Sequence, residues 1–112
     1  MIQNEIILCG SSSYTKKYYL NRDFAQLPEQ VRAELQIMCV LYTEEIGGTL
    51  QLIFDAEGNL EFCTEVEEGD LLYDEIGSAL KIKELQREKQ ELLEALQMYY
   101  RVVFLGEGLK EE

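Results

Sequence analysis

Hydrophobic and polar residues alternate on both sides of a short turn near the middle of the chain. The alternation covers residues 50–54 and 60–64, on either side of the segment 56–58. A three-residue hairpin loop with Gly58 in the left-handed conformation would place both arms in register. The predicted pairs share one face of the hairpin: Phe54 with Leu60, Leu52 with Phe62, and Leu50 with Thr64. We therefore predict an antiparallel hairpin over about 49–66.

The same turn, FDAEGNLEF, also raises the question of calcium, because acidic and amide side chains surround a glycine. Calcium loops of the helix-loop-helix type need glycine at the sixth position and glutamate at the twelfth. Counting from Asp55, glycine stands at the fourth position and Val66 at the twelfth. We interpret this stretch as a turn.

A helical pattern precedes the hairpin, over about 28–46. Pro28 suits the first turn of a helix, and Gly47 suits its left-handed end. Apolar residues follow the 3–4 spacing of one face, and others widen that face almost to the full circumference. Such a helix must be covered on most sides, either at the centre of the fold or by another subunit. The residues of the main face are Val31, Leu35, Met38, Tyr42 and Ile46, and those that widen it are Ile37, Val40 and Leu41.

After the hairpin, the pattern predicts one long C-terminal helix over about 71–104, capped by Asp70. Its polar middle, QREKQE, has no apolar residue. At roughly 50 Å the helix would be longer than a domain of this size is wide, so we expect either a kink at Gly77-Ser78 or a middle segment that leaves the core and packs elsewhere. The expected core-facing positions are Leu72, Ile76, Ala79, Ile82, Leu85, Leu92, Leu96, Tyr99 and Val103.

The N-terminal pattern predicts a strand over 6–9 and a loop over 10–13. The tyrosines of 14–21 favour a second strand there, with a short helix as the alternative. The fold class is therefore α+β: a small antiparallel sheet built on the hairpin and covered by the two helices. A length of 112 residues fits one domain, 1–112, with a frayed tail at 106–112.

The distribution of charge indicates which kinds of partner to expect. The net charge is −12, and the interval between Arg32 and Lys81 contains acidic residues but no basic ones, whereas 14–22 contains basic residues but no acid. An acidic surface repels phosphate backbones, so nucleic acid is not an expected partner, and a basic protein is the kind of partner it suits. The acids of that interval are Glu34, Glu44, Glu45, Asp55, Glu57, Glu61, Glu65, Glu67, Glu68, Asp70, Asp74 and Glu75.

No apolar run approaches the roughly 20 residues of a membrane span, and the first residues do not form a secretory signal. Three widely spaced cysteines and no histidine indicate reduced thiols without an activating neighbour. These features favour a cytoplasmic protein with no membrane contact. No catalytic residue and no cofactor can be assigned, since no phosphate-binding or nucleophile motif is present.

One acidic group is a candidate for chemistry, because six carboxylates within eleven residues could hold a divalent cation. The alternative is a solvated turn whose acids stabilise the start of the next helix. This second interpretation is favoured, because acids are expected at a helix start in any case. The candidates are Glu65, Glu67, Glu68, Asp70, Asp74 and Glu75.

The wide apolar face of the first helix and the length of the second indicate self-association. We predict a homodimer with a two-fold contact on the second helix. The interface candidates are Leu85, Leu92, Leu96, Tyr99 and Val103.

The blocks ELQIMCVLYTEEIGG, FDAEGNLEF, EGDLLYDEIGSALKIKELQ and ALQMYYRVVFLG resemble a family of small proteins from anaerobic Gram-positive bacteria. That family is catalogued only as a domain of unknown function. The resemblance implies a bacterial cytoplasmic protein and supplies no activity, ligand or catalytic residue.

Two functions follow from these observations. The favoured one is a non-catalytic, homodimeric interaction or regulatory module that presents an acidic surface to a partner. The alternative is a protein, perhaps an enzyme, that binds a small ligand or a divalent metal through the carboxylates at 65–75. A pocket of converging carboxylates would favour the alternative.

Overall fold

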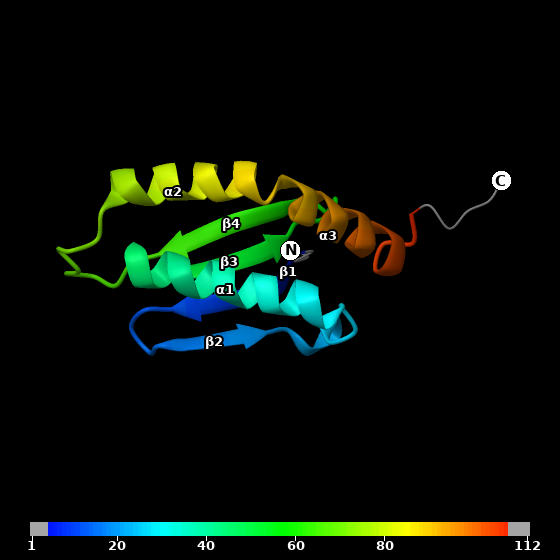
Figure 1. Cartoon of the computed structure of the whole chain (residues 1–112), viewed down its shortest axis with the longest axis horizontal. Coiled ribbons are helices and arrows are strands. Elements are labelled where there is room, and N and C mark those ends of the chain that lie inside the picture. The colour runs from blue at the N-terminus through cyan, green and yellow to red at the C-terminus, as the bar shows by residue number, and fades with distance from the viewer. Residues whose placement is uncertain (1–4, 108–112) are drawn as a thin grey trace.

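The sheet and helices of the computed structural model, which describes residues 5–107, form the α+β architecture that the sequence predicts (Figure 1). In chain order the elements are β1 (Ile6–Ser12), β2 (Lys17–Leu20), the short 3-10 helix η1 (Arg22–Phe24), α1 (Glu29–Glu45), β3 (Thr49–Phe54), β4 (Leu60–Glu65), α2 (Glu75–Glu88) and α3 (Gln90–Val103).

All neighbouring strands are antiparallel, and their order is β2-β1-β3-β4. The central hairpin has the predicted register, with Leu52 opposite Phe62 and Phe54 opposite Leu60. Gly58 has a φ of +89°, as the hairpin loop requires. The Asp55 carboxylate accepts hydrogen bonds from the backbone N–H groups of Glu57 and Asn59, each at 2.9 Å. The acidic turn that resembled a calcium loop is thus a hairpin loop stabilised by its own carboxylate.

The N-terminal strands differ from the prediction in length. β1 continues through Ser12, so Gly10, Ser11 and Ser12 of the expected loop lie in the sheet, and Ser13 begins the turn. Ser11 can do so because its buried hydroxyl is 2.8 Å from the Thr43 hydroxyl of α1. β2 covers only Lys17–Leu20 of the predicted 14–21, because the preceding residues form the turn from β1.

α1 lies across one face of the sheet and contacts β1, β2 and β3 (Figure 1). Leu35, Met38 and Tyr42 of its predicted main face are buried. Ile37 and Leu41 are exposed, so this chain covers α1 on the sheet side and not around most of its circumference. The helix ends at Glu45, and the Gly47-Gly48 pair that follows it has positive φ at both glycines.

The prediction of one continuous C-terminal helix is wrong. The chain forms two helices that meet at Lys89, whose φ of −106° and ψ of 22° leave the helical region. The break falls inside the polar stretch 86–91, where no side chain contributes to the core, and not at the expected Gly77-Ser78. A continuous helix over 71–104 would measure roughly 50 Å, whereas the break lets α3 turn onto the sheet and contact β4.

The start of the C-terminal helical region, at α2, also differs from the prediction. Asp74, and not Asp70, caps α2: its carboxylate accepts a 2.9 Å hydrogen bond from the Gly77 N–H. Residues 71–74 therefore belong to the loop that follows β4. The predicted frayed tail falls largely on 108–112, outside the described residues, and Gly106 and Glu107 are exposed.

One hydrophobic cluster joins the sheet to α1, α2 and α3. Its centre is aromatic: Phe54 of β3 stacks on Tyr100 of α3, and Phe24 stacks on Phe104. A bulge in β1 turns the consecutive residues Leu8 and Cys9 both into the core. None of the described helices is long and apolar enough to cross a lipid bilayer.

Candidate functional site

The loop between β4 and α2, residues 66–74, carries most of the carboxylates that the sequence singled out as metal candidates. Asp70 is half-buried, and the other five candidates, Glu65, Glu67, Glu68, Asp74 and Glu75, are exposed. Two of the six already accept hydrogen bonds within the chain, namely Asp70 and Asp74.

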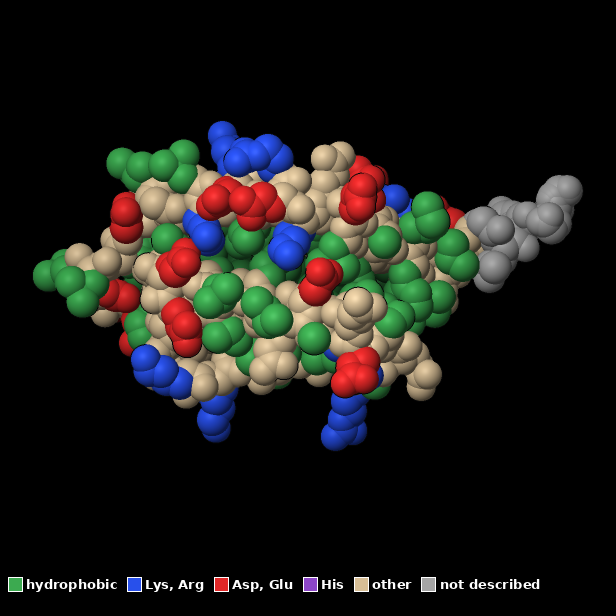
Figure 2. Space-filling view, in the orientation of Figure 1, with side chains coloured by type: hydrophobic (Ala, Val, Ile, Leu, Met, Phe, Trp, Pro, Cys, Tyr) green, Lys and Arg blue, Asp and Glu red, His purple; other side chains and the backbone are tan. Residues whose placement is uncertain are grey.

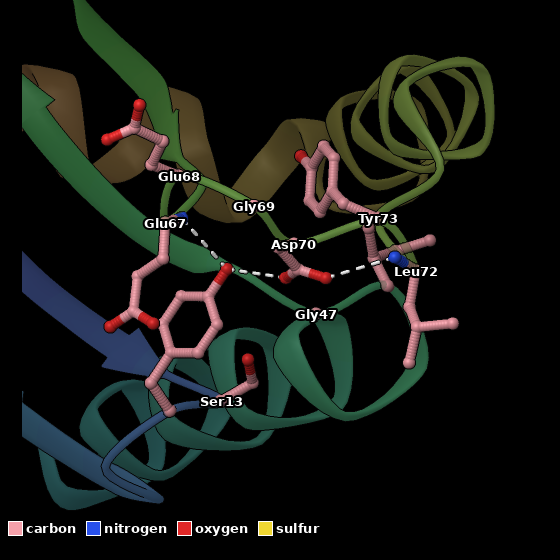
Figure 3. Close-up of a pocket in the computed structure, with 10 residues that line it drawn as sticks. Ser13, Gly47, Glu67, Glu68, Gly69, Asp70, Leu72 and Tyr73 are labelled. Carbon is pink, nitrogen blue, oxygen red and sulfur yellow. Dashed lines mark hydrogen bonds between the residues drawn. The ribbon is translucent and has the colours of Figure 1, made fainter.

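Tyr14, from the turn between β1 and β2, fixes this loop (Figure 3). Its hydroxyl donates a 2.6 Å hydrogen bond to Asp70 Oδ2 and accepts a 3.0 Å bond from the Glu67 N–H. Asp70 Oδ1 accepts a further bond from the Leu72 N–H at 3.1 Å. The hydrogen bond to the Asp70 carboxylate raises the pKa of the Tyr14 hydroxyl. The loop is therefore held at both its start and its middle.

Three hydroxyl groups anchor the end of the loop and the first turn of α2. The hydroxyls of Tyr42, Tyr73 and Ser78 form a closed triangle, in which the Tyr73–Ser78 distance is 2.7 Å and the Tyr42–Tyr73 distance is 3.2 Å. Burial raises the pKa of the Tyr42 hydroxyl. The Tyr73 ring also lies so close to Gly48 that an added Cβ would approach its Cε1 atom to 3.0 Å. These contacts attach α2 to α1.

The carboxylates of this loop do not converge. A groove of about 430 Å³ lies between the loop and the end of α1, and Glu67, Glu68 and Asp70 line it. In Figure 3 these three side chains point in different directions. Within residues 5–107, no three His, Cys, Asp or Glu side chains are grouped as ligands of one metal ion. Of the exposed carboxylates, Asp74 and Glu75 stand at the start of α2.

The predicted interface residues occupy several environments. Leu85 and Leu96 belong to the chain's own core, and Leu92 and Tyr99 pack half-buried against it. Val103, in the last turn of α3, is exposed. Leu85 and Leu96 are therefore not available to a second subunit in this fold.

A more prominent surface was not expected from the sequence. Four large apolar side chains that follow β4 are 94%, 93%, 75% and 64% exposed, and we call them the apolar ridge: Leu71, Leu72, Ile76 and Leu80. Leu72, Ile76 and Ala79 were predicted to face the core, but all three are exposed, so that prediction is wrong. The core side of α2 is formed instead by Ser78, Ile82 and Leu85.

The part of the ridge on α2 exists because this helix is apolar on two opposite faces. Ile76 and Leu80 are one turn apart and share a face, while Leu85 is on the other side of the helix. In Figure 1, α2 runs along the margin of the molecule, and Figure 2 shows hydrophobic side chains there, at the upper left, followed by basic ones. The two apolar faces of this helix are visible in the sequence, and they could have indicated that one face would be exposed.

A family model described as "Family of unknown function (DUF6145)" matches residues 5–108. The chain belongs to this family. The matched range includes every strand and helix of the fold, so the apolar ridge lies within the DUF6145 region. No curated protein and no solved structure matches this DUF6145 chain.

Proposed function

We propose that this DUF6145 protein is a non-catalytic protein-interaction module of the bacterial cytoplasm. The observation that supports this most directly is the apolar ridge of Leu71, Leu72, Ile76 and Leu80. Single exposed apolar residues are normal, but two large ones on the same outward face of a helix, such as Ile76 and Leu80, indicate a surface that another molecule covers.

The energetics favour a covered ridge. Full burial of a Leu or Ile side chain contributes about 1.5–3 kcal/mol. The ridge side chains leave most of that contribution unused, since the least exposed of them, Leu80, is 64% exposed. A partner that covers the ridge would recover it.

Hydrogen bonds within the chain also hold parts of the ridge in place. Asp70 fixes the backbone of Leu72, and the hydroxyl triangle of Tyr42, Tyr73 and Ser78 fixes the first turn of α2. A preorganised surface loses less conformational freedom when it binds, so more of the contact energy appears as affinity.

Charge supports a protein partner over a nucleic acid. Carboxylates of Glu67, Glu68 and Glu75 flank the ridge and are exposed. They would repel a phosphate backbone and attract basic side chains at the rim of an interface. The free thiols of Cys9, Cys39 and Cys63 support a cytoplasmic location, because disulfides are rare there.

Photo-crosslinking in the native cell tests the proposed function. A photoreactive residue in place of Ile76 should give a covalent adduct with another protein chain. The matched control is the same residue at Met98, which is 66% exposed but lies on α3, away from the ridge. No adduct from position 76, or equal yields from both positions, would contradict a docking role for the ridge.

A further inference from the structure

We propose that the occupant of the apolar ridge is the ridge of a second copy of this chain, with the two α2 helices antiparallel. The inference rests on the proposed function and names the partner of that same surface. It also moves the predicted homodimer contact away from Leu85 and Leu96, which belong to the core.

The outward face of α2 changes character along its length. Ile76, Leu80, Lys83 and Arg87 share this face at i, i+4, i+7 and i+11. Glu75 lies on its flank, about 100° around the helix from Ile76, and the acidic residues of the preceding loop come before it. Lys83 and Arg87 are exposed and take part in no salt bridge within residues 5–107, where Lys81 is the cation that does. The face therefore runs from acidic through apolar to basic.

A two-fold axis makes such a face complementary to itself. In an antiparallel pair, the acidic start of one helix meets the basic end of the other, and the apolar segments meet at the centre. In a parallel pair, like charges would meet instead. The observed order of charges thus favours one orientation of a second copy.

One register brings the apolar side chains together at the centre and also places acidic residues opposite basic ones. If Ile76 packs against Leu80 of the second copy, the axis passes near residue 78. Glu75 is then three residues before the axis and Lys83 five residues after it, so their levels differ by about 3 Å along the helix. Flexible Glu and Lys side chains span that difference. The acidic loop of each copy lies near Arg87 of the other.

The surroundings of α2 leave room for this contact. The helix lies at the margin of the fold, and no other element is drawn beyond it on that side (Figure 1). The ridge, the basic end of α2 and the loop form a small interface, at the lower end of the sizes seen for specific complexes. We expect a dissociation constant on the order of 10 µM.

Sedimentation equilibrium of the purified full-length chain, from about 1 to 200 µM, tests the proposal. The wild type should shift from monomer to dimer across this range. Leu80→Glu should weaken the dimer at least about 100-fold, since it places a charge at the centre of the contact. Met98→Glu is the matched control and should change the affinity less than about threefold. Because both residues are exposed, both variants should keep the thermal stability of the wild-type monomer.

A charge-reversal cycle tests the antiparallel register. Glu75→Lys and Lys83→Glu should each weaken the dimer about tenfold, and the double variant should return to within about threefold of the wild type. A wild type that stays monomeric, Leu80→Glu that dimerises normally, or losses that simply add in the double variant would each overturn the proposal.

The two proposals fail separately. If the pure protein is monomeric but position 76 captures a different protein in the cell, the second copy is wrong and the ridge remains a docking surface. If position 76 captures nothing and the pure protein is monomeric, both proposals are wrong.

Discussion

The Tyr14 hydroxyl donates a 2.6 Å hydrogen bond to the Asp70 carboxylate, although the two residues are 56 positions apart in the sequence. This bond connects the turn between β1 and β2 to the loop that carries the apolar ridge. The same hydroxyl accepts a bond from the Glu67 N–H, so one side chain holds two points of the loop. The ridge is therefore positioned by the sheet as well as by α2.

Removal of the Tyr14 hydroxyl should loosen this loop. In Tyr14→Phe, the Glu67 N–H loses its acceptor and Asp70 loses a donor, so we expect several-fold faster amide exchange at Glu67 and Leu72. Hydrogen exchange followed by NMR measures this directly. Tyr19→Phe is the control, because it removes an exposed hydroxyl whose partner, Gln51, lies within the sheet. Equal protection at Glu67 in the wild type and Tyr14→Phe would contradict the role of Tyr14.

Alkaline pH should destabilise the fold, because several tyrosine hydroxyls have a higher pKa in the folded state than in the unfolded state. Burial raises the pKa of Tyr18 and Tyr42, and the hydrogen bond to Asp70 raises the pKa of Tyr14. A raised pKa means that the folded state keeps the proton longer than the unfolded state does. This contribution to stability is present below the ordinary tyrosine pKa of about 10 and is lost as the pH rises above it. Melting temperatures between pH 8 and pH 11, values around that ordinary pKa, should therefore fall, and a flat profile would contradict these shifts.

Gly48 should tolerate alanine less well than Gly69 does. Both glycines have positive φ, so each substitution costs about 1 kcal/mol for the backbone alone. At Gly48 an added Cβ would also lie 2.7 Å from the Glu65 carbonyl oxygen, whereas at Gly69 it meets nothing within 4 Å. We expect the free energy of unfolding to fall by about 3 kcal/mol in Gly48→Ala and about 1 kcal/mol in Gly69→Ala. If urea denaturation gave similar losses of unfolding free energy for both variants, the contact between the added Cβ at position 48 and the Glu65 carbonyl oxygen would have relaxed.

The elements that the sequence predicts well are those in which local and long-range preferences agree. In the 49–66 hairpin, alternation, turn glycine and pairing all favour one register, and the structure confirms Leu52 opposite Phe62. α1 likewise starts after Pro28 and ends at Glu45, just before Gly47, as its flanking residues indicate. Both elements are specified by their own residues.

The C-terminal half was harder to predict because a helical period does not say which apolar face is inside. Ile76 and Leu80 on one side of α2, and Ile82 and Leu85 on the other, are equally good core residues by pattern alone. The break at Lys89 then decides the outcome, since it lets α3 reach β4 and leaves only one face of α2 against the fold. The exposed ridge follows from that tertiary arrangement.

Ridge and core leucines should respond differently to truncation. Leu52→Ala removes a fully buried side chain of β3 and should lower the free energy of unfolding by about 3 kcal/mol. Leu80→Ala should change the stability of the dilute monomer by less than about 0.5 kcal/mol, because the side chain is 64% exposed. Urea denaturation at low micromolar concentration measures both. A large loss in Leu80→Ala under dilute conditions would mean that the ridge packs within its own chain.

Magnesium separates the two interpretations of the carboxylates at 65–75. Asp70 and Asp74 already accept hydrogen bonds from the chain, and the side chains of Glu67 and Glu68 point apart, so no oxygen cage is ready for a cation. A cation bound only to the folded state would raise the melting temperature by mass action. We expect a change below about 1 °C in about 5 mM magnesium chloride, compared with sodium chloride of equal ionic strength to match screening. A rise of several degrees that a chelator reverses would instead support the metal-binding alternative, since screening alone is the same in both salts.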